Sequence, residues 1–85
     1  MTKEQKKTDK LVQKFLDKET EINFLIENGL KRDSKKAKKM YKIQENYWNK
    51  FIETASKLTK EEYEELENIE NLEFFYQDVI DEKSN

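Results

Sequence analysis

The stretch from Ala55 to Leu66, ASKLTKEEYEEL, decides how this chain folds. No Gly or Pro interrupts it, and its apolar residues keep a helical spacing throughout. However, Thr59-Lys60-Glu61-Glu62 has the pattern of a capping box, in which the Thr hydroxyl accepts from the amide of the third helical residue and Glu62 reaches back. A capping box starts a new helix. We therefore predict a helix boundary at Thr59.

The alternative is a helical hairpin in which residues 34–82 form one long second helix. Such a rod would measure about 73 Å at 1.5 Å per residue. It could not bury its apolar face within one chain and would have to form a dimer. Glu62 and Glu73 fall on that face, and two acids disfavour a continuous apolar seam. The hairpin with a break at Thr59 is therefore the preferred prediction.

Two more helices precede this stretch. The apolar residues of the first recur at spacings of three and four and share one face: Leu11, Val12, Phe15, Ile22, Leu25 and Ile26. Gly29 follows the last of these turns, where a left-handed helix cap is expected, and Asp33 or Ser34 can cap the next helix. The sequence thus predicts one all-α domain over 1–85, an antiparallel three-helix bundle with helices at about 3–28, 35–58 and 60–82.

The composition excludes several classes of function. Charged residues make up 42% of the chain and hydrophobic residues 34%, but aromatic residues (12%), a single Gly and no Pro favour a folded protein over a disordered one. Without His or Cys the chain has no imidazole base, thiolate nucleophile or cysteine zinc site. It also lacks a Gly-rich phosphate loop. We expect no enzyme, cofactor, metal or small-molecule substrate.

The polar N-terminal segment and the lack of a long apolar run predict a cytoplasmic protein that does not enter a membrane. The Lys, Glu and Asn bias is typical of an AT-rich genome and suggests a bacterium or its phage.

Charge is sorted along the chain. Residues 34–58 hold seven Lys and two Glu, whereas residues 59–85 hold ten acids and two Lys. In an antiparallel bundle the acids of 61–67 would lie near the lysines of the first helix. The acids near the C-terminus would lie near the turn between the first two helices: Asp78, Asp81 and Glu82 beside Lys31, Arg32 and Lys35 to Lys39.

Aromatic residues outside the predicted core faces indicate where a partner would bind. Phe24 and Phe74 fall on otherwise polar faces, and Tyr63 also lies off the core face. With Glu61, Glu64 and Glu65 they form the predicted partner-binding set. We expect a small regulatory protein, such as a phage or mobile-element accessory factor or inhibitor, whose acidic helix binds a basic protein partner or which associates with itself.

The alternative function is nucleic-acid binding through the basic start of the second helix. Its residues are Arg32, Lys35, Lys36, Lys38, Lys39 and Lys42. A single Arg leaves little capacity for reading bases. Tyr47, Trp48 and Phe51 follow this segment, and we assign them to the core rather than to a stacking platform for bases.

Overall fold

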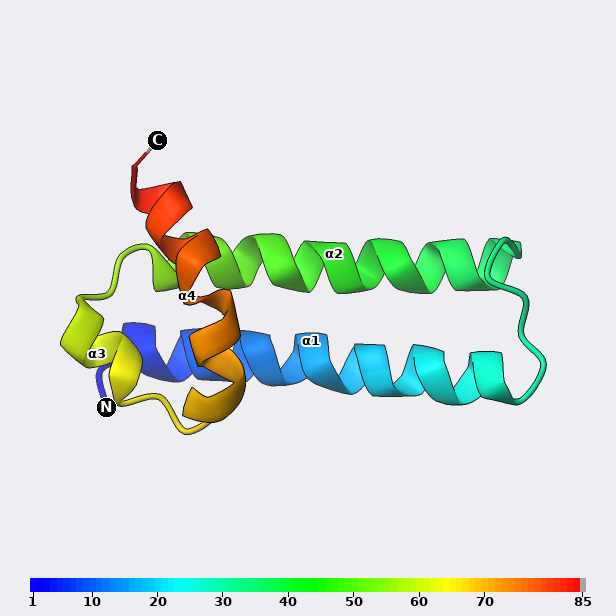
Figure 1. Ribbon diagram of the computed structural model, residues 1–85, viewed down its shortest axis with the longest axis horizontal. Coiled ribbons are helices and arrows are strands. Elements are labelled where there is room, and N and C mark those ends of the chain that lie inside the picture. The colour runs from blue at the N-terminus through cyan, green and yellow to red at the C-terminus, as the bar shows by residue number, and fades with distance from the viewer. Residues whose placement is uncertain (85) are drawn as a thin grey trace.

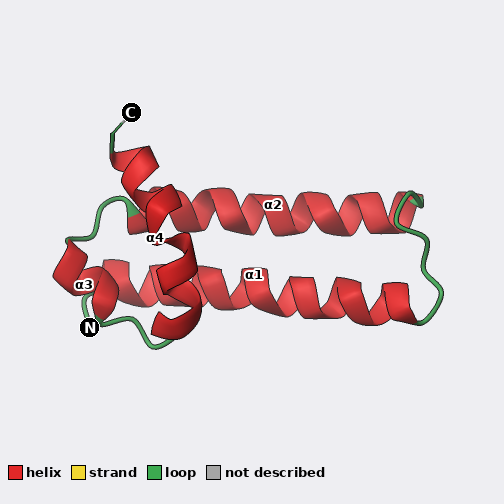
Figure 2. Ribbon diagram, in the orientation of Figure 1, coloured by secondary structure: helices red, strands yellow, loops and turns green. Residues whose placement is uncertain are grey.

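The computed structural model describes the backbone of residues 1–84 and the side chains of residues 1–68 and 72–84. Four helices follow one another, α1 (Lys3–Glu27), α2 (Lys35–Ala55), α3 (Lys60–Glu64) and α4 (Ile69–Lys83) (Figure 1). Within the described backbone every regular element is helical, as Figure 2 shows by colour. The predicted all-α class is confirmed.

The first two helices form a long antiparallel hairpin whose turn is closed at Gly29, as predicted. Gly29 has a φ of 105°, and its amide donates to the Ile26 carbonyl (3.1 Å) while the Leu30 amide donates to the Leu25 carbonyl (2.9 Å). These two bonds make a Schellman motif, which satisfies carbonyls that the helix end leaves free. Ser34 caps α2 by accepting from the Ala37 amide at 3.2 Å.

The boundary at Thr59 is also confirmed. α2 ends at Ala55, and Thr59 is the N-cap of α3. Its hydroxyl accepts from the Glu62 amide at 3.1 Å, and its own amide donates to the Glu62 carboxylate at 3.0 Å. The long continuous helix is therefore not formed.

The third helix differs from the prediction. Instead of one helix over 60–82, a turn at 65–68 separates α3 from α4. Tyr63 and Leu66, on the two sides of the end of α3, are both buried. After it, the Asn68 side-chain amide donates to the Asp9 carboxylate at 3.2 Å, so that α4 begins beside α1. α4 then crosses the hairpin instead of running along it (Figure 1).

The core lies where α4 crosses α1 and α2. Phe75 of α4 packs edge-on against Trp48 of α2, with ring centroids 4.8 Å apart, and against Phe15 of α1 at 6.0 Å. Phe51 completes this aromatic cluster, 5.4 Å from Trp48. Gln5 ties α3 to α1, because its amide donates to the Glu62 carbonyl (2.9 Å) and the Glu65 carboxylate (3.0 Å). Beyond the crossing, the hairpin continues as two helices (Figure 1).

Candidate functional site

The two exposed phenylalanines predicted as partner anchors lie in different parts of the molecule. The side chain of Phe74 is 87% exposed and that of Phe24 is 62% exposed. Phe74 is on α4, whereas Phe24 is near the end of α1 that leads into the hairpin turn. α4 lies at the opposite end of the hairpin from that turn (Figure 1). They therefore do not form one surface.

Tyr63 is not at the surface, which corrects its predicted position. Its side chain is 3% exposed, its hydroxyl donates to the Leu72 carbonyl, and its ring centroid is 4.8 Å from that of Tyr76. Burial raises the pKa of the Tyr63 hydroxyl, and the neighbouring Tyr76 and Asp78 raise it further. The cause is the turn at 65–68, which folds α4 over residue 63. Tyr63 is a structural residue.

The three predicted acids, Glu61, Glu64 and Glu65, are exposed. They lie on α3 and at the start of the turn that follows it. Glu65 accepts the hydrogen bond from Gln5, while Glu64 lines a small hollow with Glu73 and Tyr76. Of the predicted partner-binding set, only Phe74 is on α4, where it lies one helical turn before Asp78, which lines an open groove.

That groove is formed by the crossing of the helices and has a volume of about 440 Å³. Its apolar lining is aromatic and comes from α1, α2 and α4: Phe15, Tyr41, Trp48 and Phe75. Its polar lining consists of Gln44, Glu45 and Asp78. We call it the aromatic groove. Trp48 was assigned to the core, and it does pack there, but it is only half-buried and its other side is open to the groove.

An acidic hollow of about 510 Å³ adjoins the aromatic groove and shares Trp48 and Asp78 with it. Its lining includes four carboxylates and no Lys or Arg: Glu53, Asp78, Asp81 and Glu82. These positions correct the predicted charge pairing near the C-terminus. Because α4 crosses the hairpin, its acids face the C-terminal half of α2 rather than Lys35 to Lys39, and the Lys83 ammonium donates to the Leu58 carbonyl.

The aromatic groove and the acidic hollow together form one continuous surface. Phe74, Asp78 and Asp81 are spaced by four and three residues, which puts them within about 60° of one another around α4. The exposed Phe74 ring therefore flanks the carboxylates that rim the groove. The sequence offered only Phe74 as a signal, since Asp78 and Trp48 come together through the crossing angle of α4.

The predicted basic segment does not form a single patch. All six of its residues are exposed, but they are spread around α2 and the preceding turn. Lys36 and Lys39 lie within about 60° of Thr54 around the helix axis, whereas Lys35, Lys38 and Lys42 lie about 100° or more away.

Comparison with protein-family models, with curated proteins and with solved structures gives no match to this chain. Among the helices of the described residues, none is long and apolar enough to cross a lipid bilayer.

Proposed function

We propose that this chain is a small, non-enzymatic regulatory protein that binds a basic segment of a partner protein in the aromatic groove. The observation that carries the proposal is the pairing of four aromatic side chains with an acidic rim and an adjoining acidic hollow. The partner segment would insert an apolar side chain between Phe15, Trp48 and Phe75, and place Lys or Arg residues on either side of it.

The charges favour a basic partner over an acidic or neutral one. Asp78 lies at the junction of the groove and the hollow, and Asp81, Glu82 and Glu53 extend the negative surface from there. Complementary charge speeds encounter and excludes unsuitable partners. A cation placed over the face of the Trp48 ring would also gain cation–π attraction, which contributes about 0.5–1 kcal/mol at an exposed site.

The side chains that line the aromatic groove are also suited to binding rather than to catalysis. Its polar side chains are one amide and two carboxylates, and the chain contains no His or Cys to act as a base or nucleophile. Large aromatic anchors beside a charged rim are typical of protein interfaces.

Trp48 provides a direct test, because it is the only Trp in the chain and it lines the groove. Its fluorescence should change on titration with a short Trp-free peptide that combines Leu with Lys in an amphipathic pattern. A peptide with Glu in place of Lys should produce no change. Asp78→Asn should weaken binding of the Lys peptide and make it less sensitive to salt.

Phe74→Ala and Phe24→Ala form a matched pair, since both remove an exposed Phe but only Phe74 lies one helical turn from Asp78 on the rim of the groove. We expect Phe74→Ala to weaken peptide binding and Phe24→Ala to leave it unchanged. Equal effects of the two variants, or equal binding of both peptides, would contradict the proposal. A dimer in light scattering that Phe74→Ala converts to a monomer would show instead that a second copy occupies the groove.

A further inference from the structure

A second groove lies between the start of α1 and the end of α2, at the end of the hairpin opposite its turn. Its charged lining is mainly lysine. It has a volume of about 380 Å³, with Leu11 and Thr54 as its buried residues. The charged side chains around it are three lysines and one acid: Lys7, Lys50, Lys57 and Glu53. All three lysines are exposed, and no ion pair holds them among the described side chains.

The lysines continue beyond the groove along both helices. On α1, Lys14 and Lys18 lie within about 60° of Leu11, as Lys7 does. On α2, Lys36, Lys39 and Lys50 lie within about 60° of Thr54. Lys57 lines the groove from the turn that follows α2. We call these seven residues, Lys7, Lys14, Lys18, Lys36, Lys39, Lys50 and Lys57, the lysine face. Tyr41 and Trp48, which line the aromatic groove, are about 120–140° from Thr54, so the lysine face is on a different side of α2.

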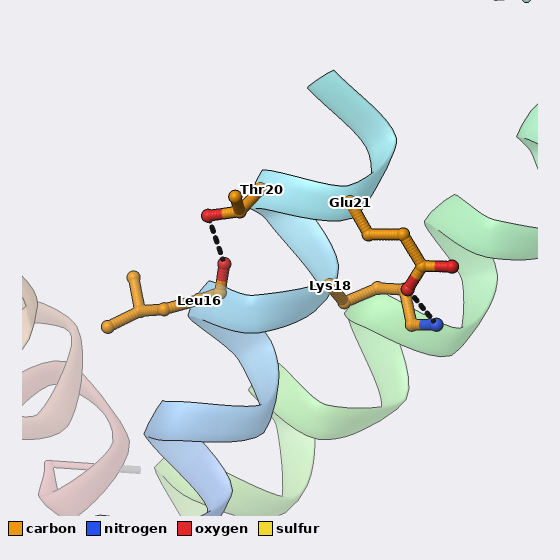
Figure 3. A network of polar contacts seen from close by, with 4 residues as sticks. All are labelled: Leu16, Lys18, Thr20 and Glu21. Carbon is orange, nitrogen blue, oxygen red and sulfur yellow. Dashed lines mark hydrogen bonds and ion pairs between the residues drawn. The ribbon is translucent and has the colours of Figure 1, made fainter. Parts of the chain in front are cut away.

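Two lysines of this face have partners. The Lys14 ammonium is 5.8 Å from the centroid of the Tyr47 ring, which brings it across from α1 toward α2. Lys18 pairs with Glu21 at 2.9 Å (Figure 3). Because such exposed contacts contribute at most about 1 kcal/mol, Lys14 can exchange its contact for one with a phosphate.

We propose that the lysine face binds the phosphate backbone of single-stranded nucleic acid along the groove between α1 and α2. Lys7 and Lys14 are seven residues apart on α1, which gives a row with an axial spacing of about 10 Å on one side of the groove. Lys50 and Lys57 form a second row on its other side. Two packed helices are about 8–10 Å apart, so the groove is suited to one strand rather than to a duplex. Tyr47, half-buried between the rows, offers a ring on which a base can stack.

This site shares no lining residue with the aromatic groove. It includes only Lys36 and Lys39 of the basic segment that the sequence suggested. The net charge of -2 would by itself repel a polyanion. Binding instead depends on the separation of positive from negative side chains, because the acids of α4 lie on another side of the molecule from the lysine face. At about 0.1 M salt only charges within about 10 Å of a phosphate act on it strongly.

The test is fluorescence anisotropy of a labelled oligothymidylate titrated with the full chain at several salt concentrations. We expect binding whose log–log dependence on salt falls by about 0.7 for each phosphate contacted. Replacing Lys7, Lys50 and Lys57 with Gln should lower the magnitude of that slope by about 2 and the affinity on the order of 100-fold at about 0.1 M salt. Replacing the same three with Arg should preserve binding, which shows that charge is what matters.

The matched control replaces Lys35, Lys38 and Lys42 with Gln, which changes the net charge equally but leaves the lysine face intact. Its affinity should stay within a few-fold of the original. Equal losses in the two Gln triples would mean a diffuse charge effect and overturn the proposal, as would no binding at low salt, tighter binding of a duplex, or binding of anionic vesicles but not of the oligonucleotide. Phe74→Ala should not alter oligonucleotide binding, so this test is independent of the one for the aromatic groove.

Discussion

The hydroxyl group of Tyr63 donates a hydrogen bond to the main-chain carbonyl of Leu72 and so joins α3 to α4 across the turn at 65–68. Both residues are buried, and the Tyr63 ring packs on Tyr76 one turn further along α4. The position of α4, and with it the aromatic groove, depends on this link.

Tyr63→Phe should lower the free energy of unfolding by about 1 kcal/mol, because a buried carbonyl loses a hydrogen-bond donor while the ring packing is kept. Chemical denaturation followed by circular dichroism measures this. The control is Tyr41→Phe, which removes the hydroxyl of a half-buried Tyr that takes no part in this link. It should change the free energy of unfolding little. No loss of stability in Tyr63→Phe would show that the bond does not hold α4.

The same hydroxyl predicts an alkaline loss of stability. Burial raises its pKa above the ordinary value of 10.0, so the folded state keeps the proton at a pH where the unfolded state has released it. The stabilisation is complete below about pH 10 and is lost as the pH rises above it, by up to about 1.4 kcal/mol per pH unit. Unfolding measured between neutral and strongly alkaline pH should give a steeper decline for the original chain than for Tyr63→Phe. Parallel declines would contradict this assignment.

Gln5→Ala should detach α3 from α1. The buried Gln5 amide donates to Glu62 and Glu65, and its oxygen accepts from the Thr2 amide at 2.6 Å. Loss of these bonds should cost about 1–3 kcal/mol in the free energy of unfolding. Gln13→Ala removes a Gln that donates to Asp17 on the surface, and it should cost less than about 0.5 kcal/mol. Similar costs for the two variants would be inconsistent with a tethering role for Gln5.

Gly29→Ala should destabilise the hairpin turn by about 1–2 kcal/mol, because L residues are strained at positive φ. An added Cβ would meet no atom within 4 Å, so the cost is conformational rather than steric. Gly29→Asn should cost less, since Asn tolerates positive φ better. Thermal unfolding of the original chain and the two variants gives the order of their stabilities. An equal loss of stability in the Ala and Asn variants would argue against backbone strain at Gly29.

Phe74→Ala and Phe75→Ala change adjacent residues with opposite surroundings. Phe75 packs against Phe15, Trp48 and Phe51, so its loss should cost about 2–4 kcal/mol. Phe74 is almost fully exposed, and its loss should change the free energy of unfolding by less than about 0.5 kcal/mol. Denaturation midpoints of the two variants check this. A comparable loss in Phe74→Ala would mean that this ring is buried in solution.

The parts of the fold that depend on local signals could be predicted from the sequence. Gly29, Ser34 and Thr59 each act through bonds to residues within five positions, so the end of α1 and the starts of α2 and α3 follow from composition and spacing. The turn at 65–68 could not be predicted, because the apolar spacing continues through it. Its residues make hydrogen bonds to distant parts of the chain, Glu65 with Gln5 and Asn68 with Asp9, and such contacts leave no local signal in the sequence.

The surfaces were less predictable than the helices. The exposure of Phe74 could be predicted because its helical position is opposite the core residues of α4. That position does not depend on the helix against which α4 packs. The aromatic groove depends on the angle at which α4 crosses Trp48. The lysine face depends on the register of α1 against α2, which brings Lys7 next to Lys50 and Lys57 although more than forty residues separate them.

The acids of α4 and the lysine face lie on different sides of α2, and this separation gives the molecule an electric dipole directed across the hairpin. In the field of a charged surface or polymer, such a molecule rotates before it makes contact, so the side presented depends on the sign of the field. A protein with a net charge of -2 can therefore approach a polyanion with its lysines leading and a polycation with α4 leading. Its orientation on encounter, more than its total charge, would set how fast each kind of partner is captured.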